Sequence, residues 1–255
     1  MINYNRLGYE IKRDFTNFSV KISQKLKRPQ QKFVHQMVYG ILAGNKLHLS
    51  EIARSLKENI TLKKTIDRLS RNLNAFDEKR AVMQDYLSLV KQHAKEDYAV
   101  IVIDNSDIAK PASRKLEALS EIRDGSTGEI TRGYLTIEAA VLSESGKMPL
   151  PVYEKVFSAA EEGFVSETHE NLCCLSSLSE NFGPKRVRTL DRGFDANDYY
   201  RCFLKRGERF VIRAKKNRNV IYNGKTCNIM DVASKYKGAC RMDFKINVAK
   251  TSSAK

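Results

Sequence analysis

Two apolar segments, each ending in an aspartate, constrain the fold of this chain more than any other feature. The first covers residues 98–104 and ends in Asp104, and the second covers residues 187–191 and ends in Asp191. A continuous apolar run of this length predicts a strand that is covered on both faces, as in α/β proteins. A carboxylate at the tip of such a strand is well placed to bind a metal ion.

The charge of the chain indicates a polyanionic partner. Its 255 residues carry a net charge of +15, which favours nucleic acid over a membrane surface because no basic amphipathic membrane helix is evident. The charge is +9 over residues 1–97, −7 over 98–182 and +13 over 183–255. Two basic blocks flanking an acidic one suit a protein that grips phosphates on both sides of a metal site. The alternative is an ordinary solvated surface with uneven charge.

The cysteines and the start of the chain indicate a cytoplasmic protein. None of the five cysteines forms a C-x-x-C pair, so zinc-ligand spacing is absent and free thiols are expected. The first 28 residues lack the apolar core of a signal peptide, and no apolar run of 18 residues is present. We therefore expect no membrane partner.

Residues 1–97 predict an all-α domain that binds DNA. After a helix over 31–45, Ser50 and Thr61 are expected to cap two helices of a helix-turn-helix unit. The second helix has one apolar stripe, and its other face presents Lys63, Lys64, Thr65, Arg68 and Arg71. Such a face suits phosphates and base edges, although any basic helix of a small bundle has the same pattern.

Residues 98–216 predict an α/β domain with the element order β-β-β-α-β-α-β. The expected strands cover 98–104, 133–143, 150–157, 187–191 and 209–214. A long polar loop is expected over 105–132, one helix from Ser166 to Phe182, and another that Asp195 caps. The pattern assigns no firm structure beyond residue 216.

This order brings the two aspartates together. Crossover helices place the carboxyl ends of parallel strands at one sheet edge, so Asp104 and Asp191 are expected on adjacent ends. Two carboxylates there suit a pair of Mg²⁺ ions about 3.5–4 Å apart, the arrangement used for phosphodiester chemistry. The alternative for each aspartate is a capping or loop-satisfying role.

The residues around both aspartates resemble the DDE transposases of bacterial insertion sequences. The resemblance rests on Ile103-Asp104-Asn105-Ser106 and above all on Leu190-Asp191-Arg192-Gly193-Phe194, and it extends over roughly residues 30–220. It implies a ribonuclease-H-like mixed sheet over 98–216, a helix-turn-helix-type domain over 1–97, and the start of a β-rich insertion over 217–255.

The resemblance also implies the activity and its partners. Such enzymes bind the terminal inverted repeats of their element as double-stranded DNA, cut it, and join it to target DNA with Mg²⁺ or Mn²⁺. A homodimer at paired ends and a location at the bacterial nucleoid in the cytoplasm are implied as well.

Individual roles follow from the same resemblance. Asp104 matches the first catalytic acid and metal ligand, and Asp191 matches the second. The DNA contacts implied or expected near them are Arg192, Arg213, Lys215 and Lys216. Arg192 has the alternative of pairing with a nearby carboxylate.

The third acid of the family is a Glu in a Tyr-x2-Arg-x3-Glu-x6-Lys signature, which does not occur after Asp191. We therefore expect a truncated form, without a third catalytic acid, that is unable to cleave DNA by itself. The alternatives are a non-catalytic DNA-binding fragment that inhibits transposition and a ribonuclease-H-like nuclease with another role.

Overall fold

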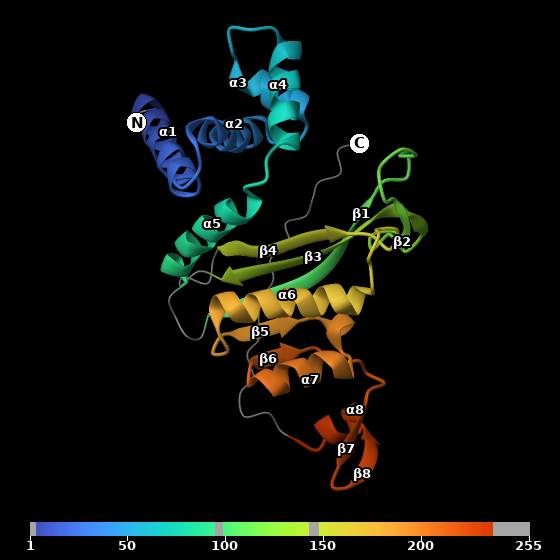
Figure 1. Cartoon of the computed structure of the whole chain (residues 1–255). Coiled ribbons are helices and arrows are strands. Elements are labelled where there is room, and N and C mark those ends of the chain that lie inside the picture. The colour runs from blue at the N-terminus through green and yellow to red at the C-terminus, as the bar shows by residue number, and fades with distance from the viewer. Residues whose placement is uncertain (1–3, 95–98, 143–147, 237–255) are drawn as a thin grey trace.

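The computed structural model describes residues 4–94, 99–142 and 148–236 and begins with a helical part (Figure 1). The helices of this part are α1 (Tyr4–Lys21), α2 (Arg28–Gly44), α3 (Leu49–Leu56), α4 (Leu62–Asn74) and α5 (Lys79–His93). Phe33, Ile52 and Leu69 form the buried centre of the α2–α4 bundle. No helix in the described ranges is long and apolar enough to cross a membrane.

Two predicted helix starts in this part have different outcomes. Thr61 precedes α4 at the N-cap position, as predicted, although its side chain makes no capping hydrogen bond. The prediction for Ser50 is wrong, because α3 already begins at Leu49 and its N-cap residue is His48. Ser50 therefore lies within the first turn of α3.

The second part is an α/β unit built on a mixed six-stranded sheet. The strands are β1 (Val100–Ala109), β2 (Ser120–Arg123), β3 (Ile130–Leu142), β4 (Pro149–Phe157), β5 (Val187–Leu190) and β6 (Arg209–Ile212). The helices are α6 (Glu167–Phe182), the short 3-10 helix η1 (Arg192–Phe194) and α7 (Asn197–Arg206). The strands follow the order β2-β3-β1-β5-β6, and β4 also pairs with β3.

Strand direction divides this sheet into two halves. β1, β5 and β6 run parallel to one another, whereas β3 is antiparallel to β1, β2 and β4. Because α6 connects β4 to β5 and α7 connects β5 to β6, the parallel half is built from crossover connections.

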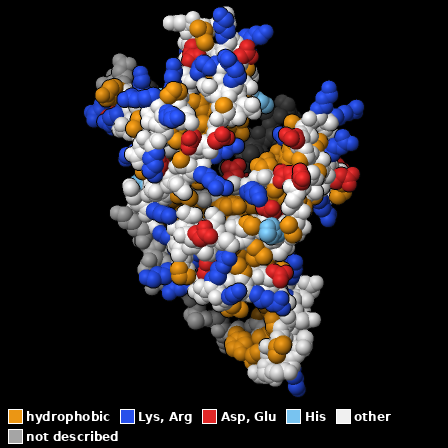
Figure 2. Space-filling view, viewed as in Figure 1, with side chains coloured by type: hydrophobic (Ala, Val, Ile, Leu, Met, Phe, Trp, Pro, Cys, Tyr) orange, Lys and Arg blue, Asp and Glu red, His pale blue; other side chains and the backbone are white. Residues whose placement is uncertain are grey.

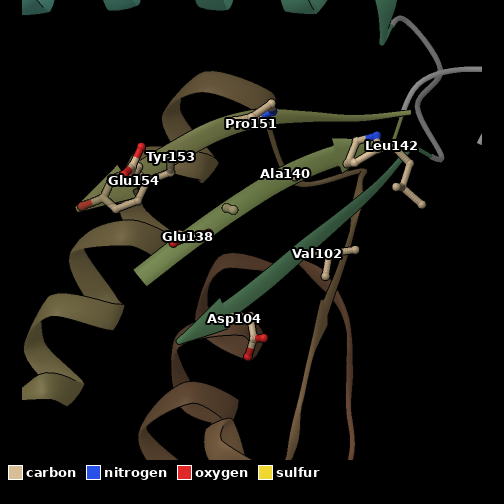
Figure 3. Close-up of a pocket in the computed structure, with 10 residues that line it drawn as sticks. Val102, Asp104, Glu138, Ala140, Leu142, Pro151, Tyr153 and Glu154 are labelled. Atoms are coloured by element: carbon tan, nitrogen blue, oxygen red, sulfur yellow. The ribbon is translucent and has the colours of Figure 1, made fainter. Parts of the chain in front are cut away.

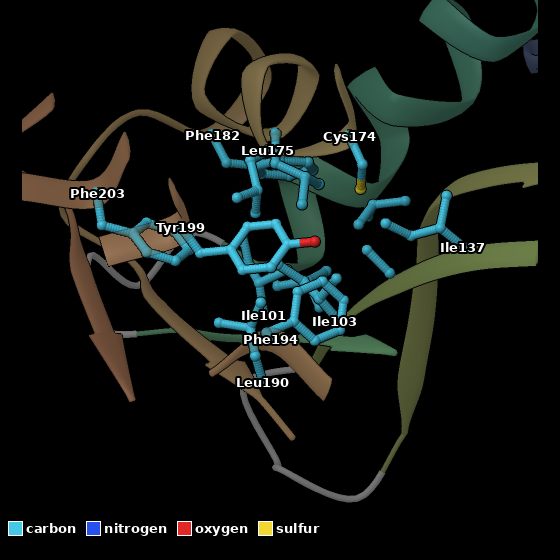
Figure 4. Close-up of a cluster of buried hydrophobic side chains, with 14 of the residues drawn as sticks. Ile101, Ile103, Ile137, Cys174, Leu175, Phe182, Leu190, Phe194, Tyr199 and Phe203 are labelled. Carbon is cyan, nitrogen blue, oxygen red and sulfur yellow. The ribbon is translucent and has the colours of Figure 1, made fainter. Parts of the chain in front are cut away.

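One face of the sheet carries the main core. Side chains alternate along a strand, so Ile101 and Ile103 of β1 point into a buried cluster with Leu175 of α6 and Phe203 of α7 (Figure 4). Val102, between them, lies on the opposite face and is 41% exposed. Asp104 shares the face of Val102, because it follows two residues later.

The largest departure from the predicted strands concerns β1. Residues 105–109 were expected in a loop, yet they continue β1 and pair with β3 as far as Ala109 opposite Gly133. The predicted loop also contains β2, so the observed order has one additional strand. Polar residues have low strand propensity, and here the long antiparallel partner overrides that preference.

The end of the described chain is a small hairpin with a helix. It consists of β7 (Asn219–Tyr222), β8 (Lys225–Asn228) and α8 (Ile229–Ala233). Asn223 and Gly224 connect the two strands with φ values of 50° and 74°, as a tight type I′ turn requires. Residue 143, the last of one predicted strand, and the part of the predicted insertion beyond residue 236 lie outside the described residues.

Candidate cation and nucleic-acid site

Strand register places Asp104 and Asp191 side by side. In the parallel pair of β1 and β5, Ile103 lies opposite Leu190, and each aspartate is the next residue of its strand or strand end. Neighbouring strands are about 5 Å apart, so the two residues are near neighbours. The setting of Asp104 differs from the prediction, because β1 continues past it to Ala109.

The charges around Asp104 act on its carboxyl group. Burial raises the pKa of Asp104, the charge of Asp191 raises it further, and Glu138 adds a smaller effect in the same direction. The backbone N–H of Asn105 donates to Asp104 Oδ1 at 3.0 Å and opposes these effects. Like charges held this close favour the binding of a proton or a cation.

A tight turn fixes the Asp191 carboxylate. The backbone N–H of Gly193 donates to Asp191 Oδ1 at 2.7 Å, which makes Asp191 the N-cap of η1. A Cβ atom at position 193 would lie 2.9 Å from that same oxygen, so a glycine fits here best. Asp191 therefore has the capping role that the sequence left open as an alternative, but only through Oδ1. Its second oxygen, Oδ2, has no hydrogen-bond partner among the described residues.

The two neighbours of Gly193 differ in their surroundings. Phe194 is 1% exposed and packs against Tyr199 with ring centroids 5.2 Å apart, which is a packing role. Arg192 is exposed and makes no ion pair with a carboxylate in the described ranges. The pairing alternative for Arg192 has no support in this structure.

Further carboxylates lie on both sides of the pair. On the open face of the sheet, Glu138 of β3 lies opposite Asp104, and Glu154 of β4 lies opposite Glu138. Figure 3 shows Asp104, Glu138 and Glu154 lining one hollow with Val102. On the helical side, Glu167 lines a cavity together with Asp104 and Asp191.

Sequence reasoning missed Glu138 and Glu167. Glu138 is one of several polar residues on an alternating strand, and only the register with β1 places it beside Asp104. Glu167 follows the capping residue Ser166 and has the pattern of an ordinary first-turn acid. No local signal in the sequence distinguishes either from a surface glutamate.

The donor groups at this edge fit a hard divalent cation. Every candidate ligand is an oxygen, the donor type that Mg²⁺ and Mn²⁺ prefer. Within the described ranges, no three His, Cys, Asp or Glu side chains lie close enough together to hold a metal ion as they stand. The Asp104–Asp191 pair is thus the part of a cation site that the backbone itself brings together.

The predicted DNA-binding face of α4 is divided. Lys63, Lys64 and Arg71 are exposed. Thr65 is 2% exposed, and its hydroxyl donates to Glu58 Oε2 at 3.1 Å. The Thr65 side chain therefore faces the bundle and does not support the predicted contact with DNA. Arg68 donates to Glu58 at 2.6 Å and to Gln36 at 2.7 Å, and it therefore links α4 to the chain before it and to α2.

The basic segment 213–218 is anchored near the aspartates. Asp195 is 5% exposed and accepts from the backbone N–H of Lys215 at 2.6 Å, from the Tyr200 hydroxyl at 2.9 Å, and from Arg218. The predicted capping role of Asp195 is wrong, because Ala196 is the N-cap residue of α7. The remaining predicted contacts are exposed side chains of this segment: Arg213, Lys215 and Lys216.

Basic side chains are not gathered on a single element. On the face that Figure 2 shows, Lys and Arg side chains lie over the helical end and also over the sheet-containing part. The backbone N–H of Arg213 donates to the carbonyl oxygen of Leu190 at 3.2 Å, so segment 213–218 starts directly beside Asp191. Exposed positive charge thus begins next to the carboxylate pair.

Comparisons with known proteins give structural likenesses alone. No protein-family model matches the chain, and no curated protein matches it. Among solved structures, it is similar to a piggyBac transposase in the cryo-EM structure of a synaptic complex with hairpin DNA. The identity is 14% and the TM-score 0.41, over 79% of this chain and 47% of that chain. This chain therefore spans about half the length of that transposase.

Proposed function

We propose that this protein is a divalent-cation-dependent DNA-processing protein of the transposase type. Residues 98–216 form its ribonuclease-H-like core, residues 1–97 a helix-turn-helix-type DNA-binding domain, and 217–255 the start of an insertion. The supporting observation is the register of β1 and β5, which sets Asp104 beside Asp191 within a basic chain. This pairing agrees with the two acidic motifs that resemble DDE transposases.

Asp104 and Asp191 are the residues that would hold Mg²⁺ or Mn²⁺. When bound, the cations supply activation of water or of a 3′-hydroxyl and stabilise the leaving oxygen of a phosphodiester. The chain supplies positioning: β1 fixes Asp104 between two neighbouring strands, and Gly193 fixes Asp191. Carboxylates held in this way need little rearrangement to bind an ion.

The proposed DNA partner is duplex DNA, specifically the terminal inverted repeats of an insertion sequence and its target. Exposed cations on α4 and beside the carboxylates would contact phosphates and position the duplex: Lys63, Lys64, Arg71, Arg192, Arg213, Lys215 and Lys216. A homodimer at paired ends, in the bacterial cytoplasm at the nucleoid, completes the proposal.

A second candidate is a DNA-binding protein that does not cleave. It is favoured because the described residues hold no preformed group of three metal-binding side chains, and because the third-acid signature is not in the sequence. The two candidates differ in one property, which is cleavage in the presence of a divalent cation.

The distinguishing experiment measures duplex binding and nicking with the whole chain. Binding to labelled duplex DNA is measured in EDTA, and nicking of supercoiled plasmid in Mg²⁺ and in Mn²⁺. A transposase-type core nicks the plasmid, and Asp104→Asn and Asp191→Asn abolish nicking while duplex binding persists. Glu180→Gln, an exposed carboxylate at the far end of α6, serves as the matched control.

The possible results separate the candidates. Duplex binding in EDTA without nicking in either cation favours the non-cleaving protein. Cleavage of RNA–DNA hybrids with intact plasmid identifies a nuclease with another role. Absence of duplex binding at low salt would contradict both DNA-directed proposals.

A further inference from the structure

An apolar groove lies at the helical end of the molecule, where α1 packs beside α2 (Figure 1). Its volume is about 680 Å³. The apolar side chains that line it come from α1, α2 and the last residue of α3: Ile11, Phe15, Tyr39, Leu42, Ala43 and Leu56. A groove of this size is large enough to hold a ligand or several side chains of a partner.

The apolar faces of α1 and α2 extend beyond the aromatic rings through which these helices pack. Phe15 of α1 packs against His35 and Tyr39 of α2, with ring centroids 4.6 and 5.7 Å apart. Ile11 lies one helical turn before Phe15 and is 61% exposed, and Leu42 follows Tyr39 by nearly a turn and is 68% exposed. Within the described ranges, no further element covers these two side chains.

A helix is the kind of element that fits this opening. Two walls of the groove are helical, so a third helix can pack its ridges of side chains against both of them. Side chains at positions i, i+3, i+4 and i+7 of such a helix form one apolar stripe, which can contact Ile11 and Leu42 together. Contiguous exposed apolar surface with a polar rim is typical of an interaction site.

The charges at the groove determine which kind of helix fits. None of the described residues that line it carries a carboxylate, and Lys12, which lines it, has no ion-pair partner in the described ranges. Burial lowers the pKa of His35, so this second basic side chain of the lining is uncharged at neutral pH. The carboxylates of α1 and α3 already pair with arginines of their own helices: Glu10 with Arg6, Asp14 with Arg13, and Glu51 with Arg54. The groove therefore offers an unpaired positive charge beside apolar surface.

A second copy of this chain does not provide a complementary helix. Residues 1–97 carry a net charge of +9, so two helical parts brought together at the groove repel each other. The acidic segment 98–182 contains α6, but α6 buries its apolar face in the main core, with Leu175 and Leu178 each 1% exposed. The complementary occupant is therefore a helix of another protein.

We propose that the groove binds an acidic amphipathic helix of a protein partner. The apolar stripe of that helix packs on Ile11, Tyr39 and Leu42, and a carboxylate at its edge pairs with Lys12. A charge pair at the rim contributes mainly to specificity and to the rate of association. This proposal goes beyond the proposed function, because it concerns neither the aspartate pair nor duplex DNA.

The test is fluorescence anisotropy of labelled synthetic peptides with the whole chain. The probe is a helical peptide of about 18 residues, with leucines along one face and glutamates on the others. One control peptide has the same composition in scrambled order and lacks the apolar stripe, and the other has lysines in place of the glutamates. We expect the chain to bind the probe, and to bind each control peptide at least about tenfold more weakly.

Variants of the chain locate the bound probe. Leu42→Glu should weaken binding at least about tenfold, because it places a carboxylate against the apolar stripe. Lys12→Glu should weaken binding by about threefold to tenfold, and by less at high salt. Val20→Glu and Lys21→Glu make the same changes on exposed residues of α1 that do not line the groove, and they should bind as the wild type does. Circular dichroism melts verify that each variant is folded.

The opposite results would overturn the proposal. If the probe binds Leu42→Glu as tightly as the wild type, or no more tightly than the scrambled peptide, the general basic surface holds it. If the probe does not bind at millimolar concentration, the groove does not receive an acidic helix. If the wild-type chain sediments as a dimer and Leu42→Glu as a monomer, the occupant is a second copy. A larger loss of duplex binding in Leu42→Glu than in Val20→Glu would instead identify the groove as a nucleic-acid contact.

Discussion

Gly193 positions Asp191 because it has no side chain. A Cβ atom there would lie 2.9 Å from Asp191 Oδ1, which now accepts the backbone N–H of the same glycine. We expect Gly193→Ala to displace the carboxylate and to weaken Mn²⁺ binding about tenfold, as changes around a metal ligand commonly do. Calorimetric titration checks this, with Gly8→Ala as a control because nothing lies within 4 Å of its added Cβ. Unchanged affinity in Gly193→Ala would refute this role of the glycine.

Asp195 is a structural carboxylate that anchors segment 213–218. Burial alone would raise the pKa of Asp195, but hydrogen bonds from Lys215, Tyr200 and Arg218 outweigh burial and hold this pKa below its usual value. We expect Asp195→Asn to lower the free energy of unfolding at neutral pH by about 3 kcal/mol, the cost of breaking a buried ion pair. Urea denaturation measures this change.

The pH dependence of that loss has a definite sign. A carboxylate with a depressed pKa in the folded state stabilises the fold above its unfolded pKa of about 4 and loses that contribution as the pH falls through the folded value. The difference between wild type and Asp195→Asn should therefore shrink in acid. Asp198→Asn, whose exposed carboxylate lies 3.9 Å from Arg201, should change little at any pH. A difference that grows on acidification would contradict the assignment.

At the scale of elements, the basic side chains of α4 have two different roles: some face solvent, and one links α4 to its neighbours in the helical bundle. Lys63 and Lys64 are exposed, whereas Arg68 bonds Glu58 and Gln36. We expect the double variant Lys63→Ala/Lys64→Ala to weaken duplex binding. The slope of the logarithm of the binding constant against the logarithm of the salt concentration should become less steep by about two. Fluorescence anisotropy at several salt concentrations measures both quantities.

Arg68→Ala provides the contrast on the same helix. It should lower the free energy of unfolding by about 1–3 kcal/mol, because it leaves the partly buried Glu58 and the buried Gln36 without their partner. Urea denaturation measures this loss. If Lys63→Ala/Lys64→Ala leaves duplex binding unchanged, α4 is not the DNA-contacting helix.

Elements with local signals were predicted well from the sequence, and those that depend on distant partners were not. Ser166 accepts the backbone N–H of His169 and starts α6, and Gly183 ends it, as expected from the capping pattern. The second half of β1 and all of β2 were predicted as loop, because their strand character comes from pairing with β3. Propensity within a short window contains no information about such a partner.

At the scale of the whole molecule, some residues of the candidate site could be predicted from local sequence signals, and others depend on partners that are distant in the sequence. The neighbourhood of Asp104 and Asp191 follows from the crossover rule, which fixes how successive parallel strands are placed. Glu138 reaches the site through an antiparallel register, and Glu167 reaches it through the docking of α6 on the sheet. Neither arrangement is encoded in the residues that surround each glutamate.

The central claim is that Asp104 and Asp191 act together as one cation site. The most direct measurement is a calorimetric Mn²⁺ titration of the wild-type chain, of Asp104→Asn, of Asp191→Asn and of the double variant. A shared site predicts strong coupling, so that either single variant loses nearly as much affinity as the double variant. Wild-type affinity in either single variant, or losses that simply add in the double variant, would show that the two aspartates do not share an ion.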